Sequence, residues 1–529
     1  MNKKIILLTL GLVQASILFS QMQLSPASQK MVMTLFALKN LYVEKVDENK
    51  LVEDGIKSII KDLDPHSAYM TADETNEMNE PLQGGFDGIG ISFNMLNDTL
   101  YIIEVISGGP SEKVGMLPGD RIIKVDGEVI AGVKMNNREI MKRLKGTRGT
   151  LVSIMVQRRN LPDLLNFKII RGKIPIYSVD ASFMVNKNTG YIRINRFGAT
   201  TLDEFNTALK ELKKQGMSQL VIDLESNGGG LLSAAVDLAN EFLKKGNTIV
   251  YTMGANSPRQ DNFAKGNGSF ETGKLVILID EYSASASEIL SGAIQDWDRG
   301  IIIGRRSFGK GLVQRPIPLP DGSVLKLTVA KYFTPSGRFI QKPYENTENY
   351  SSDLIDRYNR GEMSNADSIH FPDSLRTNTL VSHRKIYGGG GIMPDVFVPL
   401  DTTVFTTLHR KLSNAGILNR FSISYIDEHR AEFAKKYPTA DVFIAKFKTD
   451  TILENSLIQF AQNEKIKLLP EDLNSNKDLM MKQLKAFMVR DLGKSSDYYK
   501  VMWTQNESLL KAIEILNDKN AYDEILKRN

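Results

Sequence analysis

Leu275-Val-Ile-Leu-Ile279 is an unbroken aliphatic run, and Ser283-Ala-Ser-Ala-Ser-Glu288 follows it almost at once. Such a run is typical of a strand buried on both faces of a parallel sheet. Residues 285–297 behind it have a helical pattern. The same order recurs earlier, where the apolar residues 220–224 precede a helical stretch at 231–244. Strands alternating with helices predict βαβ connections and therefore an α/β domain.

Ser285 lies at the junction between this predicted strand and its helix. A junction of this kind exposes a side chain and directs backbone N–H groups toward it, which suits a nucleophile. The pattern Ser285-Ala-Ser-Glu288 also fits a capping box, in which the serine only ends the helix. Both interpretations stay open, because one residue can serve both purposes.

Lys310, in Phe308-Gly-Lys-Gly-Leu312, follows Ser285 by 310 − 285 = 25 residues, and Gln314 comes four residues later. A lysine can act as a base near neutral pH only if its pKa falls well below the usual value of about 10.4. Apolar neighbours such as Leu312 lower the pKa by desolvating the amine. Gln314 could orient that amine without adding a charge. The pattern predicts a serine activated by lysine, whereas an exposed turn lysine is the simpler alternative.

The chain has five histidines, and none is near these serines in the sequence. His66, in Leu-Asp-Pro-His-Ser67, has no partner at metal-ligand spacing, so we interpret it as a residue that stabilises a turn. The segment Gly304-Arg-Arg-Ser-Phe-Gly-Lys-Gly311 imitates a phosphate-binding loop. It lacks the hydroxyl residue after the lysine, and Pro316 and Pro318 break the helix that should follow. Nucleotide binding is therefore excluded, and Arg305 and Arg306 either approach Lys310 or face water.

A glycine cluster lies between the other predicted strand and helix, in Asp223-Leu-Glu-Ser-Asn-Gly-Gly-Gly-Leu-Leu232. Backbone N–H groups of such a loop can stabilise the oxyanion of a tetrahedral intermediate. We predict an oxyanion hole made by Gly229 or Gly230 together with Ala286. A flexible turn without a chemical role is the alternative.

Residues 83–172 contain short apolar strands separated by glycine turns and two short helical stretches. The strands are predicted at 89–93, 101–105, 121–125 and 152–156, and the helices at 110–115 and 136–144. Gly88-Ile89-Gly90-Ile91 can present backbone N–H groups to the terminal carboxylate of a peptide, which then adds to the strand edge. With Gly108-Gly-Pro-Ser111, Leu117-Pro-Gly-Asp120 and Ile123-Lys-Val-Asp-Gly127, this stretch resembles a PDZ domain.

The length of 529 residues is too great for one core, and 42% hydrophobic with 24% charged residues is ordinary globular composition. A net charge of +5, without clustering, favours no nucleic acid. We predict a signal peptide at 1–20, a helical region at 21–82, the PDZ domain at 83–172, an α/β core at 173–401 with a polar surface insertion at about 343–379, and a helical accessory region at 402–529. The basic start, apolar run and small residues of 1–20 indicate export to the periplasm, an uncleaved membrane anchor being the weaker alternative. Without cysteine, neither a disulfide nor a lipid-modified cysteine can form.

These motifs, in this order, resemble the carboxyl-terminal processing proteases, the S41 serine peptidases of bacterial periplasm and plastids. The resemblance covers residues 42–399 and includes Tyr332-Phe-Thr-Pro-Ser-Gly-Arg338 and Gly391-Ile-Met-Pro-Asp395. It implies a crotonase/ClpP-like protease core with an inserted-style PDZ domain and helical regions at both ends. It also implies Ser285 as nucleophile, Lys310 as general base and Gln314 as its orienting partner, without cofactor or metal. A homodimer formed through the N-terminal helices and a peripheral association with the membrane are further implications.

One residue departs from the family pattern, because Glu225 stands where an arginine is usual. This puts the electrostatics beside the oxyanion glycines in doubt, but not the dyad. The sequence as a whole predicts a serine endopeptidase that cuts exported proteins near their C-termini. Two alternatives are an adaptor that binds C-termini without cutting them and a helical scaffold organised by its two ends.

Overall fold

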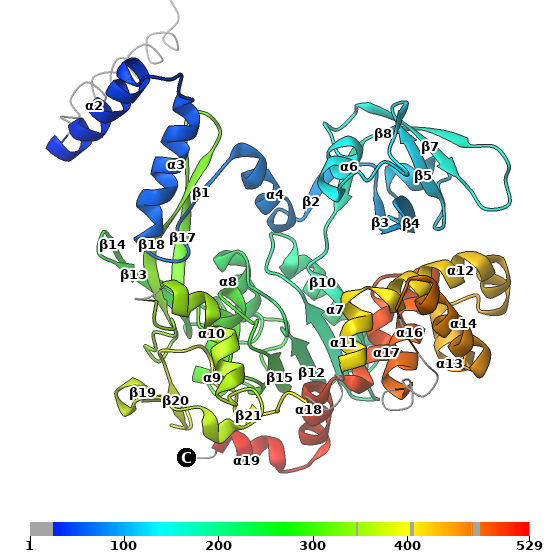
Figure 1. Ribbon diagram of the computed structural model, residues 1–529. Coiled ribbons are helices and arrows are strands. Elements are labelled where there is room, and N and C mark those ends of the chain that lie inside the picture. Colours follow the sequence, from blue (N-terminus) through cyan, green and yellow to red (C-terminus); the bar gives the residue numbers. More distant parts are fainter. Residues whose placement is uncertain (1–24, 345–346, 402–406, 467, 469–476, 528–529) are drawn as a thin grey trace, which may run out of the picture. The chain divides into compact units, whose positions relative to one another are not determined.

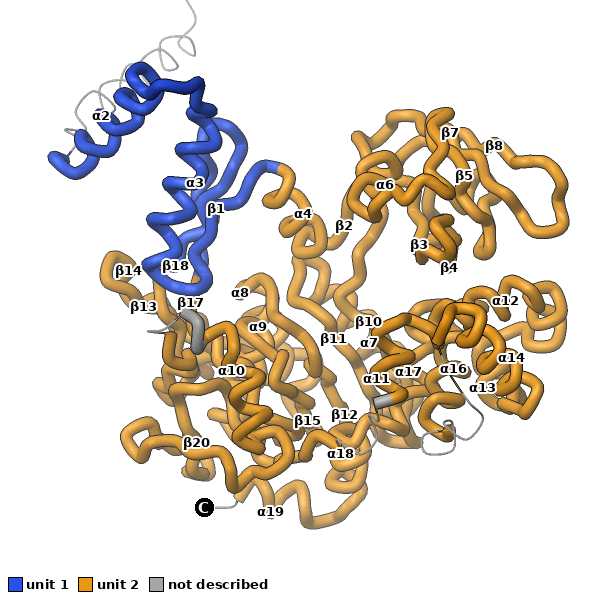
Figure 2. Tube along the Cα trace, viewed as in Figure 1, with its two compact units in different colours: residues 1–72, 314–328 blue, residues 73–313, 329–529 orange. Residues whose placement is uncertain are grey.

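The computed structural model describes residues 25–344, 347–401, 407–466, 468 and 477–527. The chain divides into two compact units, one of residues up to 72 with 314–328 and the other of 73–313 with 329–529 (Figure 2). The predicted signal peptide lies outside the described residues. Within the described ranges, no helix is both long and apolar enough to cross a membrane.

The smaller unit joins the N-terminal helices to a hairpin from the middle of the chain. Ser25 caps the first helix by accepting from the Ser28 N–H, and Asp47 caps the second by accepting from the Lys50 N–H. Tyr69 lies opposite Leu325 in an antiparallel strand pair. The elements are α2 (Pro26–Leu41), α3 (Glu48–Lys61), β1 (Ala68–Met70), and the turn side of the hairpin made by β17 (Leu312–Pro318) and β18 (Val324–Phe333).

The second unit contains the domain that resembles PDZ, with a sheet in the order β3-β4-β5-β7-β8. Alternate residues of its strands, such as Val152 and Ile154, are fully buried, which gives the domain its own core. The elements are α4 (Ala72–Leu82), β2 (Gly85–Gly88), β3 (Ile91–Leu96), β4 (Thr99–Val105), α5 (Pro110–Lys113), β5 (Arg121–Val125), β6 (Glu128–Val129), α6 (Asn137–Leu144), β7 (Leu151–Gln157), β8 (Leu165–Ile170) and β9 (Gly172–Pro175). Antiparallel pairing of β2 with β9 closes the two ends of the domain.

A six-stranded sheet in the order β10-β11-β12-β15-β16-β21 forms the centre of the unit. It runs parallel from β11 to β21, and only its edge strand β10 is antiparallel. The predicted α/β core is therefore confirmed (Figure 1). The elements are β10 (Val179–Met184), β11 (Thr189–Ile194), α7 (Thr201–Lys214), β12 (Gln219–Asp223), α8 (Leu232–Asn240), β15 (Lys274–Ile279), α9 (Ala286–Asp296), β16 (Ile301–Gly304) and β21 (Val396–Phe397).

The two faces of this sheet are covered by different parts of the chain. Helices α7, α8 and α9 cover one face, where Ile222 and Ile277 meet Phe205 and Leu290. The last helices, α18 (Glu507–Asn517) and α19 (Ala521–Lys527), cover the other, where Val276 packs with residues such as Leu509. The sequence predicted an accessory region from 402 onward. The final helices instead form part of the protease core, because they bury one face of its sheet.

The rest of the C-terminal region has a separate hydrophobic core built from helices. Its helices are α11 (Thr407–Asn414), α12 (Ile417–Lys436), α13 (Ala440–Lys446), α14 (Thr451–Asn463), α16 (Lys477–Leu492) and α17 (Asp497–Met502). The polar segment predicted as a surface insertion contains α10 (Thr347–Asn359), β19 (Arg376–Asn378) and β20 (Lys385–Tyr387). A small sheet of β13 (Thr248–Gly254) and β14 (Ser257–Phe263) pairs with the end of β18.

Candidate active site

Ser285 stands at the start of α9 with an unusual backbone, φ 56° and ψ −112°. An ordinary N-cap residue has extended backbone, and a serine at positive φ is strained. Its N–H donates to Glu288 Oε2 over 2.8 Å, so the glutamate half of the predicted capping box exists. Ser285 is therefore the N-cap residue of α9 and has a strained backbone.

The neighbouring serines differ from Ser285 in burial and bonding. Ser283 and Ser287 are fully buried. Their hydroxyls donate to backbone oxygens, Ser283 to Leu224 over 2.8 Å and Ser287 to Asn227 over 2.9 Å. Ser285 is half-buried. The outer serines of the alternating motif thus fix the glycine loop, and the middle one reaches the surface.

Glu288 connects the serine to the loop that carries Lys310. Its carboxylate is fully buried. Besides the Ser285 N–H, it accepts from the Gly309 N–H at 2.7 Å, the Lys310 N–H at 2.9 Å and the Ser307 hydroxyl at 2.5 Å. Burial raises the pKa of Glu288, and these four hydrogen bonds oppose the rise by stabilising the ionised form.

Tyr332, at the end of β18, connects the same two segments through their carbonyl groups. Its buried hydroxyl is 3.2 Å from the Ser285 carbonyl oxygen and also donates to the carbonyl oxygen of Lys310. Burial raises the pKa of this phenol well above its ordinary value, so it remains a donor. Two side chains therefore contact the backbone of both predicted catalytic residues, and the structure brings Ser285 and Lys310 together.

The two arginines before Lys310 have partners of their own. Arg305 Nε donates to Glu281 over 2.6 Å, and Arg306 pairs with Glu362. Arg357 of α10 is also buried and donates to the carbonyl oxygens of Arg306 and Ser307. The arginines thus neither face open water nor act as free charges, and the predicted surface insertion helps hold the lysine loop.

The glycine loop lies directly against Ser285. A Cβ built on Gly229, whose φ is +97°, would come within 2.8 Å of Ser285 Cβ and 2.9 Å of the Ala286 nitrogen. Only glycine fits this position. The Gly229 N–H donates to Asn227 Oδ1 over 2.9 Å, so that N–H is used inside the loop. Of the two predicted glycine donors, this favours Gly230 as the partner of Ala286.

Gln314 belongs to the smaller unit, where its side chain joins the turn that contains His66. The Gln314 amide donates to Thr328 Oγ1 over 3.2 Å, and that hydroxyl donates to Asp64 Oδ1 over 3.0 Å. Asp64 Oδ1 also accepts from the His66 N–H over 2.8 Å, which holds the predicted histidine turn through its backbone. Asp64 is ionised in this setting, because its hydrogen bonds hold its pKa below the ordinary value despite desolvation by burial.

The predicted carboxylate-binding loop is the turn between β2 and β3. Gly90 has φ +80°, which suits glycine alone, and Ile89 is buried with its carbonyl oxygen accepting from Ser111. Ile91 is the first residue of β3, the strand at the edge of its sheet. The loop Gly88–Ile91 thus ends at a strand edge, as peptide addition requires.

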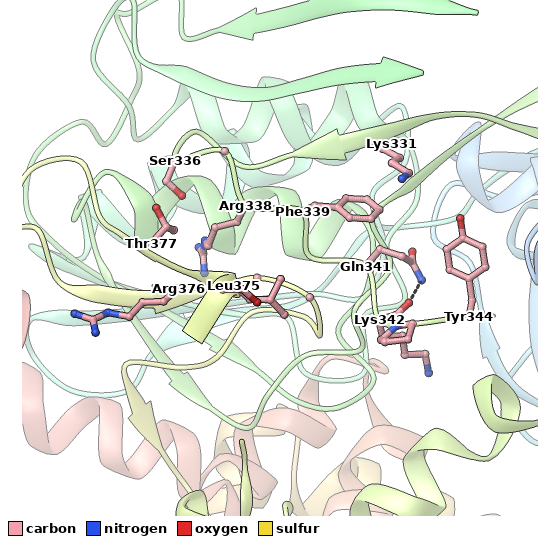
Figure 3. Close-up of a pocket in the computed structure, with 15 residues that line it drawn as sticks. Lys331, Ser336, Arg338, Phe339, Gln341, Lys342, Tyr344, Leu375, Arg376 and Thr377 are labelled. Carbon is pink, nitrogen blue, oxygen red and sulfur yellow. Dashed lines mark hydrogen bonds between the residues drawn. The ribbon is translucent and has the colours of Figure 1, made fainter. Parts of the chain in front are cut away.

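Figure 3 shows a cavity of about 700 Å³ beside the lysine loop. Gln341 lines it, and its Oε1 accepts from the N–H of Gly311, the residue after Lys310, over 2.8 Å. None of the described lining residues is acidic. Phe339 and Leu375 line the cavity together with lysine and arginine side chains: Lys331, Arg338, Lys342 and Arg376. Arg338 is buried against Asp296, and Lys342 pairs with Asp353, whereas Lys331 and Arg376 are exposed. Sequence patterns did not reveal this cavity, because its walls come from segments far apart in the chain.

Glu225, the residue that departs from the family pattern, is partly buried next to the glycine loop. Its carboxyl accepts from the Asn506 amide over 2.5 Å. Burial and the carboxylates of Asp223 and Asp280 raise the pKa of Glu225 to about 8. Near neutral pH Glu225 is therefore an uncharged acid, at a position where the family usually has the cation of an arginine.

Three family models match parts of this chain. The model of peptidase family S41 matches residues 188–348, that of the PDZ domain residues 88–169, and that of a family of unknown function residues 408–493. A carboxy-terminal-processing protease of Bartonella bacilliformis is 37% identical over 309 residues, which are 58% of this chain and 70% of that protein. The carboxy-terminal processing protease CtpB of Bacillus subtilis is 35% identical over 58% of this chain and 64% of that protein.

Among solved structures, a photosystem II D1 C-terminal processing protease is 28% identical, over 59% of this chain and 90% of that one, with a TM-score of 0.34. The fold and the sequence matches define a serine-type peptidase with a PDZ domain. The chain belongs to the carboxy-terminal processing proteases of peptidase family S41.

Proposed function

We propose that this protein is a serine endopeptidase with a Ser285–Lys310 dyad, which cleaves exported proteins near C-termini captured by its PDZ domain. One observation carries the dyad. Glu288 accepts from the N–H groups of both residues, and Tyr332 contacts the carbonyl oxygens of both. Residues 25 positions apart in sequence thus share two buried anchors, which is the fixed geometry that a nucleophile and its base need.

In the proposed reaction the neutral Lys310 amine takes the proton of the Ser285 hydroxyl as Oγ attacks the scissile carbonyl carbon. The tetrahedral intermediate collapses when the Lys310 ammonium gives its proton to the leaving amine. Water, deprotonated in turn by Lys310, then attacks the acyl-enzyme and releases the second product. Gly230 and Ala286 would donate their N–H groups to the oxyanion in both halves of the reaction.

Gln314 is proposed to orient the Lys310 amine. Its amide nitrogen faces Thr328, which Asp64 holds in turn. The role comes from the resemblance to the family, in which the glutamine acts like the third member of a catalytic triad. An amide oxygen can accept from an amine without adding charge.

Substrate capture is assigned to the edge strand β3 and the loop Gly88–Ile91. Beside the lysine loop, the cavity with Lys331 and Arg376 is proposed to hold substrate residues near the scissile bond. Exposed cations in a cavity whose described lining holds no acid favour acidic substrate side chains. Lys331→Glu or Arg376→Glu should raise KM for peptides with acidic residues near the cleavage site. Either substitution should leave KM for neutral peptides unchanged.

Location and assembly follow from the N-terminal region. Export to the periplasm is proposed from the signal-like residues 1–20. Helix α2 has no buried residue and exposes a row of apolar side chains, among them Met33, Phe36 and Leu41. We assign this helix to contact with a second copy, in line with the resemblance, with peripheral association with a membrane as the competing use. Phe36→Glu should then convert the dimer to a monomer in a sedimentation experiment. An unchanged mass would refute the assignment.

The dyad is tested with an unfolded model protein whose fragments are identified by mass spectrometry. Ser285→Ala and Lys310→Ala should each lower kcat by at least about 10³-fold, as loss of a member of a catalytic unit does. Lys326→Ala is the matched control, because burial lowers the pKa of Lys326 and its loss should leave kcat unchanged. Amidation of the substrate C-terminus should raise KM if the PDZ domain captures the carboxylate. Full cleavage by either dyad variant would refute the proposal.

A further inference from the structure

The last part of the chain reaches the glycine loop through one asparagine. Asn506 caps α18, and its Oδ1 accepts from the Leu509 N–H over 2.9 Å. Its Nδ2 donates to Glu225 Oε2 over 2.5 Å. Both ends of one amide are thus engaged, one with the helix that covers the protease sheet and the other with the segment before the oxyanion glycines.

Glu225 is part of a tightly held segment. Its N–H donates to Asp223 Oδ1 over 2.8 Å, and its carbonyl oxygen accepts from Arg193 over 2.9 Å. The next residue, Ser226, has φ 61°, and its N–H donates to Asp280 Oδ1 over 2.9 Å. A serine at positive φ is strained and keeps this conformation only when its surroundings impose it.

The same segment continues into the nucleophile. The Asn227 carbonyl oxygen accepts from the Ala284 N–H over 3.0 Å and from the Ser287 hydroxyl over 2.9 Å, on either side of Ser285. Gly229 has no room for even a Cβ against Ser285. A shift at Glu225 of a few tenths of an ångström therefore changes where the N–H of Gly230 lies relative to the serine, and small misplacements of oxyanion donors lower kcat.

We propose that Asn506 is a positioning residue for the peptidase reaction, which acts through Glu225 to fix the oxyanion loop of residues 225–230. The C-terminal helix α18 thereby becomes part of the catalytic machinery as well as of the core. The inference rests on the proposed function, since it concerns the donors of that same site. Glu225 suits this role, because the Asn506 amide requires an acceptor there. The side chain of the arginine that is usual in the family has no acceptor atom.

Charge around Glu225 gives the contact a pH dependence. The groups that face it are the carboxylates of Asp223 and Asp280, the cations of Arg193 and Arg305, the phenol of Tyr191, and Ser508 with Glu507 from the tail. Because the pKa of Glu225 is raised, these surroundings disfavour its ionised form overall. Below about pH 8 the carboxyl is neutral and the contact is intact. Above that pH, repulsion from the two aspartates strains the loop, and kcat should fall.

The test uses the full chain and three variants. Asn506→Ser keeps a good helix cap but removes the amide that donates to Glu225. Glu225→Gln keeps an acceptor for the Asn506 amide and removes the carboxyl group that titrates. Gln219→Ala is the matched control, because it removes another hydrogen bond to α18, that from Gln219 to the Leu516 carbonyl oxygen, away from the loop. The readouts are kcat, KM, melting temperature and amide hydrogen exchange of residues 223–230.

We expect N506S to lower kcat about tenfold with KM and melting temperature nearly unchanged, and to speed exchange in residues 223–230. E225Q alone should keep kcat at neutral pH and lose the fall in kcat above about pH 8. Unchanged exchange in N506S, or equal losses of kcat in N506S and Q219A, would overturn the inference. Faster exchange with no cleavage by the wild type would uphold the loop contact and refute the peptidase function instead.

Discussion

Glu288 and Glu225 are two glutamates of the candidate site with different surroundings, Glu288 bonded to the serine and Glu225 just before the glycine loop. Glu288 is fully buried, and four donors surround its carboxylate. Glu225 is partly buried beside Asp223 and Asp280, with Asn506 and Ser508 as its donors. Burial raises the pKa of both carboxyl groups. Four hydrogen bonds oppose the rise at Glu288, whereas the carboxylates of Asp223 and Asp280 add to it at Glu225.

This difference divides the site into a permanent part and an adjustable one. The lysine side is fixed by residues of the core, among them Glu288, Tyr332 and Arg357. On the proposed oxyanion side, Glu225 accepts from Asn506 of the last part of the chain, and its pKa is raised to about 8. The comparison teaches that burial alone does not set the role of an acid, since the groups around it either oppose or add to the rise in its pKa.

The strongest test of the permanent side is Glu288→Gln. A glutamine cannot accept from all four donors, and its own N–H₂ would face them. Each hydrogen bond to a charged group contributes about 1.5–3 kcal/mol, and an unsatisfied buried donor costs about as much. We expect kcat to fall roughly 100-fold or more, together with a lower melting temperature. If E288Q cleaves at the wild-type rate, the carboxylate does not hold the dyad.

Tyr332→Phe is the milder test of the same side. It removes one hydroxyl donor and leaves the ring packing of this buried residue intact. A neutral hydrogen bond contributes about 1 kcal/mol, so kcat should fall about fivefold to tenfold. With one peptide substrate, kcat should be higher for Y332F than for E288Q. A larger loss of kcat in Y332F would mean that Tyr332 contributes more to holding the site than Glu288 does.

The smallest expected effect concerns stability on the adjustable side. Glu225 has a folded pKa of about 8 against an ordinary 4.5, so it stabilises the fold fully below about pH 4.5 and loses that contribution as the pH rises to about 8. Glutamine does not titrate. The melting temperature of E225Q relative to that of the wild type should therefore rise between pH 5 and pH 8. The expected rise is on the order of 1–2 °C in so long a chain. A difference that is constant with pH would mean that Glu225 is ionised in the folded protein throughout.

Much of the α/β core was predictable because it depends on local patterns. The run Leu275–Ile279 lies in the strand β15, and residues 285–297 contain α9, since an uninterrupted apolar run followed by a helical pattern leaves a plain signature. The four predicted PDZ strands correspond to β3, β4, β5 and β7, whereas β8 (Leu165–Ile170) was missed although its apolar and polar residues alternate. Ser285 and Lys310 were predicted from their motif and spacing, and their shared anchors support that pairing.

The chain by itself determined which residues can do chemistry: a serine at a strand–helix junction, a lysine between glycines and a glycine loop. Only the tertiary structure decided how they are held. Nothing in the sequence connects Asn506 to Glu225, which are 281 positions apart, or shows that Tyr332 and Glu288 each contact both halves of the dyad. Side-chain contacts between distant segments depend on how the sheet is covered, and a linear pattern does not record that packing.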